Sequence, residues 1–182
     1  MIDRGLHIFN AVLVAALWGG NLWLYLSEPP EIPMHYWFGQ PTWYAQPVPE
    51  NVFLVPLLLT VVLGLAYVFA WRLTDLRKRL SAPRQEKYDA LSGDQQRAVV
   101  GLVQRYLYAV VAAVLILFVV KMPGQYAIAH EQADALPLYA RMVSWVAVGG
   151  IILGIALLRR AMTKSIDRRY AKREAAAANS ST

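Results

Sequence analysis

Long apolar blocks alternate with polar segments along the chain, and four such blocks dominate the sequence. They cover residues 2–26, 52–71, 106–120 and 142–158, and the last three contain no charged residue. A helix of about 17–25 residues crosses the roughly 30 Å core of a bilayer. The third block has only 15 residues, but its flanks lengthen it if Arg105 and Lys121 snorkel toward the lipid headgroups. The pattern therefore predicts four membrane-spanning helices.

Proline and capping signals set the bounds that we predict for these helices. Pro29 and Pro30 end the first helix, and Pro56 falls in the first turns of the second, where its missing N–H costs little. Ser92 and Gln95 have the spacing of a capping box at the start of the third. The predicted helices are residues 3–27, 51–80, 93–121 and 137–173, with an outer loop at 28–50 and a cytoplasmic linker at 81–92. Residues 1–174 then form one domain, and residues 175–182 form a disordered tail.

The connections between these helices determine the predicted fold class. No segment shows the alternating pattern of a strand, and short connections favour antiparallel neighbours. We therefore predict an all-α integral membrane protein whose four transmembrane helices form an up-down bundle.

Composition and charge agree with membrane insertion and predict its direction. Of 182 residues, 57% are hydrophobic and 16% are charged, whereas about a quarter are charged in soluble domains. The net charge is +6, but the basic residues gather at 72–105 and 159–173, and the other two connections hold only Lys121 and Arg141. The positive-inside rule then places both termini in the cytoplasm. We expect the lipid bilayer, and anionic lipid at the basic inner segments, to be partners, and we expect no nucleic-acid binding.

Two features of the sequence bear on processing and on disulfides. The first apolar block is longer than the apolar region of a signal peptide and lacks a convincing cleavage site, so we interpret it as a retained helix. The chain contains no cysteine, so no disulfide framework can be inferred.

Small residues recur four positions apart on the first and fourth predicted helices. Such spacing lets two helix backbones approach closely where lipid supplies no hydrophobic driving force. The pattern favours packing of these two helices within one chain, and a homodimer seam is the alternative. The residues concerned are Ala15 with Gly19, Ala16 with Gly20, and Gly150 with Gly154.

Candidate chemistry is sparse along this chain. The polar residues within the apolar blocks are not ionisable, which weighs against a pump or transporter. A metal site built from His35, His130 and Glu131 is conceivable, but these residues lack the spacing of a known metal motif. The alternative is an outer polar cluster in which Glu131 or Asp134 pairs with Arg141. No nucleophile or phosphate-loop motif occurs, so we predict a non-enzymatic protein without a cofactor.

The stretch "EPPEIPMHYWFGQPTWY", followed by the proline-containing second helix, carries a family signal. It resembles the bacterial membrane module called domain of unknown function 1648, which also occurs in immunity and signalling membrane proteins of the SdpI type. Tyr36-Trp37-Phe38 fills a shorter gap than the family has, and Thr42 stands where the family often has an acidic residue. The resemblance covers roughly residues 10–67. The matching positions are Ile32, Pro33, His35, Gly39, Pro41, Trp43 and Pro56.

The resemblance implies a small inner-membrane protein of bacteria, of immunity or regulatory type, that acts through contacts with other membrane proteins. The alternative is an accessory subunit of a larger membrane complex, and a transporter or small-molecule receptor is a third reading. The aromatic residues of the loop suit a membrane interface, where rings meet both apolar and polar surroundings. We expect His35 to fix the loop by hydrogen bonds to its backbone.

Overall fold

The computed structural model describes residues 2–77 and 80–180. Four of its helices are long and apolar enough to cross a membrane, which confirms that part of the prediction. These candidate spans are Arg4–Leu26, Pro49–Arg72, Gly93–Ala129 and Leu138–Ala176. The helices are α1 (Ile2–Leu26), α2 (Pro49–Arg72), α3 (Ala82–Asp89), α4 (Gly93–Val119), α5 (Met122–Ala129) and α6 (Leu138–Ser180), and the strands are β1 (Ile32–Trp37) and β2 (Gln40–Ala45).

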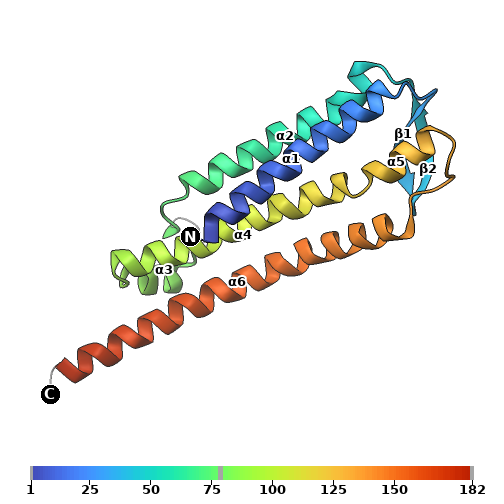
Figure 1. The fold of residues 1–182 in the computed structure, drawn as a ribbon. Coiled ribbons are helices and arrows are strands. Elements are labelled where there is room, and N and C mark those ends of the chain that lie inside the picture. Colours follow the sequence, from blue (N-terminus) through green and yellow to red (C-terminus); the bar gives the residue numbers. More distant parts are fainter. Residues whose placement is uncertain (1, 78–79, 181–182) are drawn as a thin grey trace.

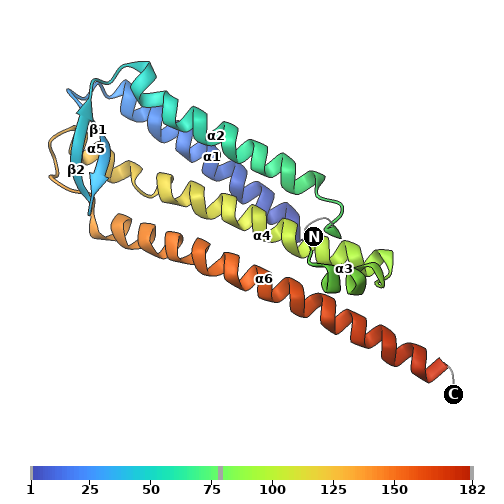
Figure 2. The same cartoon turned by 180° about the vertical axis from the view of Figure 1, so that it is seen from behind.

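The long helices run alternately up and down in one elongated bundle (Figure 1). α1, α2 and α4 pack against one another, and α6 packs along α4. The strands and α5 lie at one end of the bundle, here called the hairpin end, and α3 lies at the other, here called the α3 end (Figures 1 and 2). The first described residues of α1 and the last of α6 are both toward the α3 end.

Three groups of buried side chains hold the bundle together. The group at the α3 end contains Tyr88 and Ile166, so it ties α3 to α6. The middle group joins α1 to α4 through residues such as Leu17 and Leu115. The group at the hairpin end joins Ile32 of β1 to the helices around it. Burial of apolar surface contributes about 25 cal/mol per Å² to the stability of a fold. These three groups therefore hold both ends of the molecule in place.

The segment from Ile32 to Ala45 corrects the all-α prediction, because it forms an antiparallel hairpin. Its tip is Phe38-Gly39, and both residues have positive φ, 48° and 88°. Two consecutive residues with positive φ form a tight turn whose twist matches the right-handed twist of the two paired strands. Prolines at positions 33 and 41 hid the strands in the sequence, since proline cannot donate to a ladder and usually argues against a strand.

Two predicted helix bounds between α2 and α4 are wrong. α2 ends at Arg72 and not at residue 80, because Leu73 and Leu76 turn into the buried group at the α3 end. Gln104 of α4 donates to the carbonyl oxygen of Leu73 (3.0 Å) and holds this turn. The predicted linker 81–92 contains α3, which begins with a proline in its first turn.

The later helices also differ from their predicted bounds in part. The capping box of Ser92 and Gln95 at the start of α4 is confirmed. α4 ends at Val119, and α5 restarts the helix at Met122 with Pro123 in its first turn. The predicted tail is helical over its described residues, since α6 continues to Ser180. Its alanine run explains this, because alanine has the highest helix propensity.

Candidate functional site

A cavity of about 140 Å³ lies beneath the hairpin and is here called the hairpin cavity. Four parts of the fold enclose it: α1, the first half of α2, β1, and the junction of α4 with α5. Its apolar lining includes residues from all of these parts. Its polar lining residues are Asn21, Tyr36, Asn51, Lys121 and Gln125.

Asn21 lies on the α1 wall of the hairpin cavity and is buried. Its side-chain amide donates to the carbonyl oxygen of Leu17 (2.7 Å) and contacts the sulfur of Met122 (3.7 Å). Gly20 permits this approach, because a Cβ there would meet the same sulfur at 2.4 Å. The glycine therefore brings α5 against α1 at the cavity.

Tyr36 reaches the cavity from β1, and its hydroxyl oxygen is buried without a hydrogen-bond partner among the described residues. Gln125 interacts with this phenol and lowers its pKa, but the geometry falls short of a hydrogen bond. Burial has the larger effect and raises the pKa of Tyr36 well above its usual range. The phenol therefore stays protonated at neutral pH and can donate a hydrogen bond.

Gln125 of α5 and Lys121 at the start of α5 complete the polar wall. Gln125 donates to the carbonyl oxygen of Pro33 (3.4 Å), which links α5 to β1. Lys121 is half-buried and lines the cavity, whereas the sequence predicts that its side chain snorkels toward headgroups. No carboxylate lines the cavity, and Lys121 has no ion pair within the described part of the chain.

The residues that carry the resemblance lie in different parts of the hairpin end. Ile32, Pro33 and Pro56 line the hairpin cavity. His35 and Trp43 lie on the exposed face of the hairpin. Gly39 forms the tip and Pro41 pairs with a β1 residue.

His35 has a different partner from the one that the sequence suggested. Its Nδ1 lies 2.7 Å from the hydroxyl oxygen of Thr42, across the hairpin, and no bond from its ring to the backbone is found in the described residues. The Thr42 hydroxyl also contacts the carbonyl oxygen of His35 (3.4 Å). Thr42 is thus the hydrogen-bond partner of this histidine.

The weak metal candidates are not brought together. The two ring nitrogens of His130 face the carbonyl oxygens of Tyr126 (2.9 Å) and Ser27 (3.3 Å), and the ring stacks on Tyr126. Across residues 2–77 and 80–180, no group of three or more histidine or acidic side chains could hold a metal ion. Glu131 makes no ion pair with Arg141 there; Arg141 instead donates to the carbonyl oxygen of Phe38 (3.3 Å).

Two of the small residues of α1 and α6 face other helices, and none of them packs these two helices against each other. Gly20 faces Met122, and Gly154 faces Tyr106 of α4, whose hydroxyl would lie 2.8 Å from an added Cβ. The remaining residues of the pattern lie open, with Ala15 and Ala16 exposed and nothing within 4 Å of a Cβ at Gly19 or Gly150.

Sequence reasoning missed a polar aromatic cluster inside the bundle. His7 of α1 hydrogen-bonds the hydroxyl of Tyr67, and its ring packs edge-on against Tyr108. The buried Asn10 donates to the carbonyl oxygen of Tyr108 (3.1 Å). The cluster borders an apolar groove of about 390 Å³ between α1, α2 and α4. Its members come from three helices, so no local spacing indicates it.

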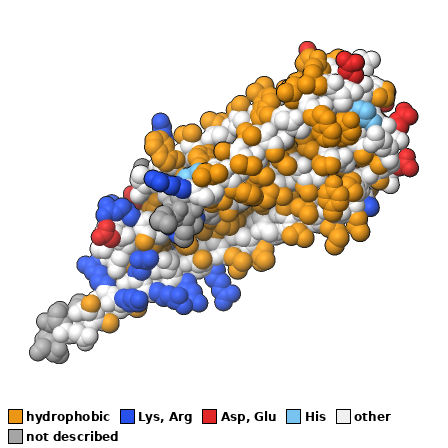
Figure 3. Space-filling view, viewed as in Figure 1, with side chains coloured by type: hydrophobic (Ala, Val, Ile, Leu, Met, Phe, Trp, Pro, Cys, Tyr) orange, Lys and Arg blue, Asp and Glu red, His pale blue; other side chains and the backbone are white. Residues whose placement is uncertain are grey.

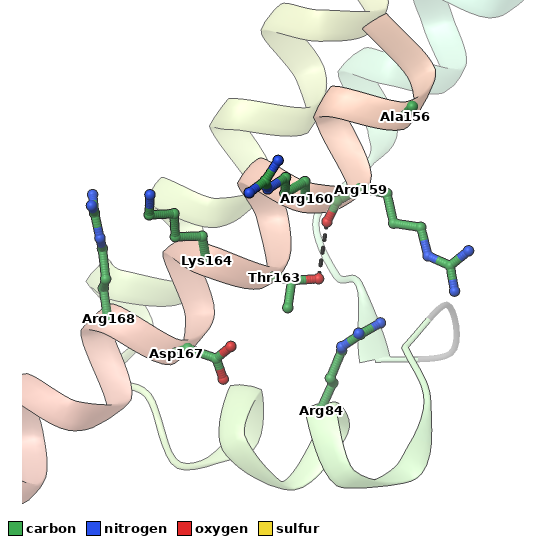
Figure 4. Close-up of a pocket in the computed structure, with 8 residues that line it drawn as sticks. All are labelled: Arg84, Ala156, Arg159, Arg160, Thr163, Lys164, Asp167 and Arg168. Carbon is green, nitrogen blue, oxygen red and sulfur yellow. Dashed lines mark hydrogen bonds between the residues drawn. The ribbon is translucent and has the colours of Figure 1, made fainter. Parts of the chain in front are cut away.

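A basic groove of about 590 Å³ lies between α3 and α6 at the α3 end, and is here called the α3–α6 groove (Figure 4). Arg84 and Arg159 extend on one side of α6, and Lys164 and Arg168 extend on the other. Its acidic residue, Asp167, already pairs with Lys87 (2.7 Å), and this bond raises the pKa of Lys87. The groove therefore retains a strong positive charge.

Comparison of the chain with models of protein families, with curated proteins and with solved structures finds no match. The resemblance to the domain of unknown function 1648 thus gains no support from these comparisons and stays a prediction.

Proposed function

We propose that this chain is a non-enzymatic, multi-pass protein of the bacterial cytoplasmic membrane that acts through contacts with another membrane protein, as an immunity or regulatory protein. In the proposed topology both termini are cytoplasmic and the hairpin faces outward. The observation that carries the proposal is an aromatic hairpin that is exposed and firmly fastened. Trp37, Phe38 and Trp43 are 66%, 69% and 60% exposed.

The fastening of the hairpin supports a role in recognition. Its tip accepts two bonds from the segment around the start of α6: Leu136 N–H to the Gly39 oxygen (2.8 Å) and Arg141 to the Phe38 oxygen (3.3 Å). Gln125 holds its first strand. A preorganised surface loses less conformational entropy on binding, and aromatic residues dominate the energy of many interfaces.

Native mass measurement after detergent extraction tests the proposal. We expect a stoichiometric assembly that dissociates when Trp37 and Trp43 are both changed to serine. Trp145→Ser is the matched control, because Trp145 is equally exposed (66%) but lies on α6 within an apolar span. A wild-type chain that is extracted alone would contradict the proposal, as would equal loss of the partner in the control.

A second candidate function is that of an accessory subunit in a larger membrane complex. The apolar stretch of α6 favours it, because none of the residues in that stretch is buried within the chain. Gly149 and Gly150 on this helix have no atom within 4 Å of an added Cβ, so a neighbouring helix could approach them closely. Gly150→Leu would then disrupt the assembly while the Trp37 and Trp43 changes would not.

We also propose anionic lipid as a partner at the α3 end. The basic side chains of the α3–α6 groove support it, because the groove lies where α6 leaves its apolar stretch. Each basic residue near an anionic membrane surface contributes about 1 kcal/mol to binding.

A further inference from the structure

Lys121, in the lining of the hairpin cavity, has no counterion within the described residues. Lys121 lines it half-buried, and within the described residues neither the cavity wall nor an ion pair supplies a carboxylate. Removing an ammonium group from water without a nearby opposite charge is costly. An anion that enters the cavity can therefore pair with an ammonium group that no carboxylate of the wall neutralises.

Two further polar groups in the lining of the hairpin cavity, on Tyr36 and Gln125, can donate hydrogen bonds. The Tyr36 phenol is protonated, and its buried hydroxyl has no partner within the described part of the chain. Gln125 uses one N–H of its amide for the Pro33 oxygen, and an amide carries a second. An ammonium group, a phenol and an amide around one space form a donor set that suits an oxyanion.

Charge and volume restrict the chemical class of the ligand. One ammonium group balances one negative charge, which fits a carboxylate better than a phosphate dianion. The volume of about 140 Å³ corresponds to roughly four or five water molecules. The apolar part of the wall, with Leu17, Val55 and Phe118, can accommodate a short hydrocarbon chain.

We propose that the hairpin cavity binds a short-chain monocarboxylate. Its carboxylate pairs with Lys121 and accepts a hydrogen bond from Tyr36, and its alkyl chain packs on the apolar wall. Three motif residues, Ile32, Pro33 and Pro56, then serve as walls of a ligand site. The inference does not depend on the proposed protein partner, and its tests measure ligand binding alone.

The first test compares two ligands of nearly equal shape on the purified, unaltered chain. Isothermal calorimetry should show saturable binding of butyrate, and at least about tenfold weaker binding of the neutral butyramide, because hydrogen bonds to charged groups are the stronger ones. Equal affinity for the two ligands, or no saturable binding of butyrate, would overturn the proposal.

The source of the carboxylate is tested in the same assay. The carboxylate could belong to a small acid dissolved in water or to a fatty acid in the bilayer. Palmitate presented in lipid nanodiscs should fail to displace butyrate, because its chain exceeds the cavity. Displacement by palmitate would overturn the assignment to a short, water-borne acid.

Two substitutions test the residues named. Lys121→Met keeps the aliphatic stem and should weaken butyrate binding at least about tenfold, and Tyr36→Phe should weaken it several-fold. Lys172→Met and Tyr44→Phe are matched controls, because both residues lie outside the cavity lining, and binding should not change. Unchanged binding in Lys121→Met would refute the site. If that variant fails to fold, the comparison of butyrate with butyramide on the unaltered chain still decides.

Discussion

Three polar side chains inside the membrane-length helices bond to carbonyl oxygens one turn back on their own helix. Asn21 donates to Leu17, Thr60 to Pro56 and Ser144 to Ala140. Such local bonds satisfy a polar group where lipid offers no partner. These residues are therefore compatible with a bilayer without any functional role.

Thr60 has an additional structural role at the centre of the bundle. Its oxygen also accepts a bond from the indole N–H of Trp18 (3.0 Å), which joins α1 to α2. The carbonyl oxygen that Thr60 uses belongs to Pro56, which lies inside α2 and not in its first turns. A proline at that depth removes a helix N–H, so the side-chain bonds around it help to hold the helix together.

The buried phenol of Tyr36 should make the folded protein less stable at high pH. Its pKa is higher in the folded protein than in the unfolded chain, because burial disfavours the phenolate. Above the ordinary value of 10.0 the unfolded chain therefore binds fewer protons than the folded one, and stability falls as pH rises. For one such group the slope is at most about 1.4 kcal/mol per pH unit.

Chemical unfolding of the wild type and of Tyr36→Phe between neutral pH and about pH 11 measures this effect. The difference in stability between the two proteins should be constant up to the ordinary tyrosine pKa and should then shrink or reverse in favour of Tyr36→Phe. The exposed Tyr44 supplies the control variant, Tyr44→Phe, which should follow the wild type. Parallel pH profiles for all three proteins would contradict a buried phenol.

At the scale of the element, the hairpin depends on one exposed side-chain pair as well as on its backbone. His35 and Thr42 hydrogen-bond across the strands. Exposed cross-strand pairs contribute roughly 0.2–1 kcal/mol. His35→Ala and Thr42→Ala should each lower the thermal stability slightly. The double variant should be as stable as the less stable of the two single variants, because either change alone removes the bond.

A double-mutant cycle by thermal unfolding in detergent checks this, with metal analysis of each preparation. Additive losses would show that the two side chains do not act as a pair. A metal ion that copurifies with the wild type but not with His35→Ala would contradict the structural role of this histidine.

The sequence predicted those elements whose signals are local. The prolines at 29 and 30 follow the end of α1 closely, and Ser92 with Gln95 caps α4 as the spacing indicates. The hairpin was missed because Pro33 and Pro41 interrupt its strands and its turn carries Phe38 at a positive φ, which few large residues adopt.

The hairpin cavity could not be predicted from the sequence, because its polar residues are spread from residue 21 to residue 125. Only the residue at the end of the third apolar block indicated such a site. Lys121 closes an apolar block and is one of the few basic residues at the hairpin end, but the sequence interpretation assigned it to the headgroups. Its placement depends on how α5 restarts the helix after Val119.

We expect the α3–α6 groove to bind anionic lipid selectively. Arg84→Gln with Arg159→Gln removes two charges from one side of the groove. Two charges at about 1 kcal/mol each correspond to about thirtyfold weaker binding. In nanodiscs of mixed phosphatidylglycerol and phosphatidylcholine, native mass spectrometry should therefore show much less bound phosphatidylglycerol for this variant.

The control for the groove has the same change of charge elsewhere on α6. Lys172→Gln with Arg173→Gln removes two exposed charges that do not line the groove. It should retain phosphatidylglycerol like the wild type. An equal loss in both variants would mean that net charge alone attracts the lipid, and that the groove has no special role.

At the scale of the whole molecule, the two ends differ in charge and in structure. Lysine and arginine side chains gather toward the α3 end, acidic side chains appear at the hairpin end, and hydrophobic side chains cover the length between them (Figure 3). This asymmetry supports the proposed topology, because basic segments of membrane proteins are retained on the cytoplasmic side. Both ends of the described chain lie toward the basic end.

The proposed topology is tested directly because the chain contains no cysteine. Two single-cysteine variants, Gln132→Cys near the hairpin and Glu86→Cys on α3, place one exposed thiol at each end of the molecule. In intact bacterial cells, a membrane-impermeant maleimide should label position 132 and should label position 86 only after the membrane is permeabilised. The unaltered chain is the blank. Labelling of position 86 in intact cells would reverse the orientation, and then the hairpin would face a cytoplasmic partner and the α3–α6 groove the outer leaflet.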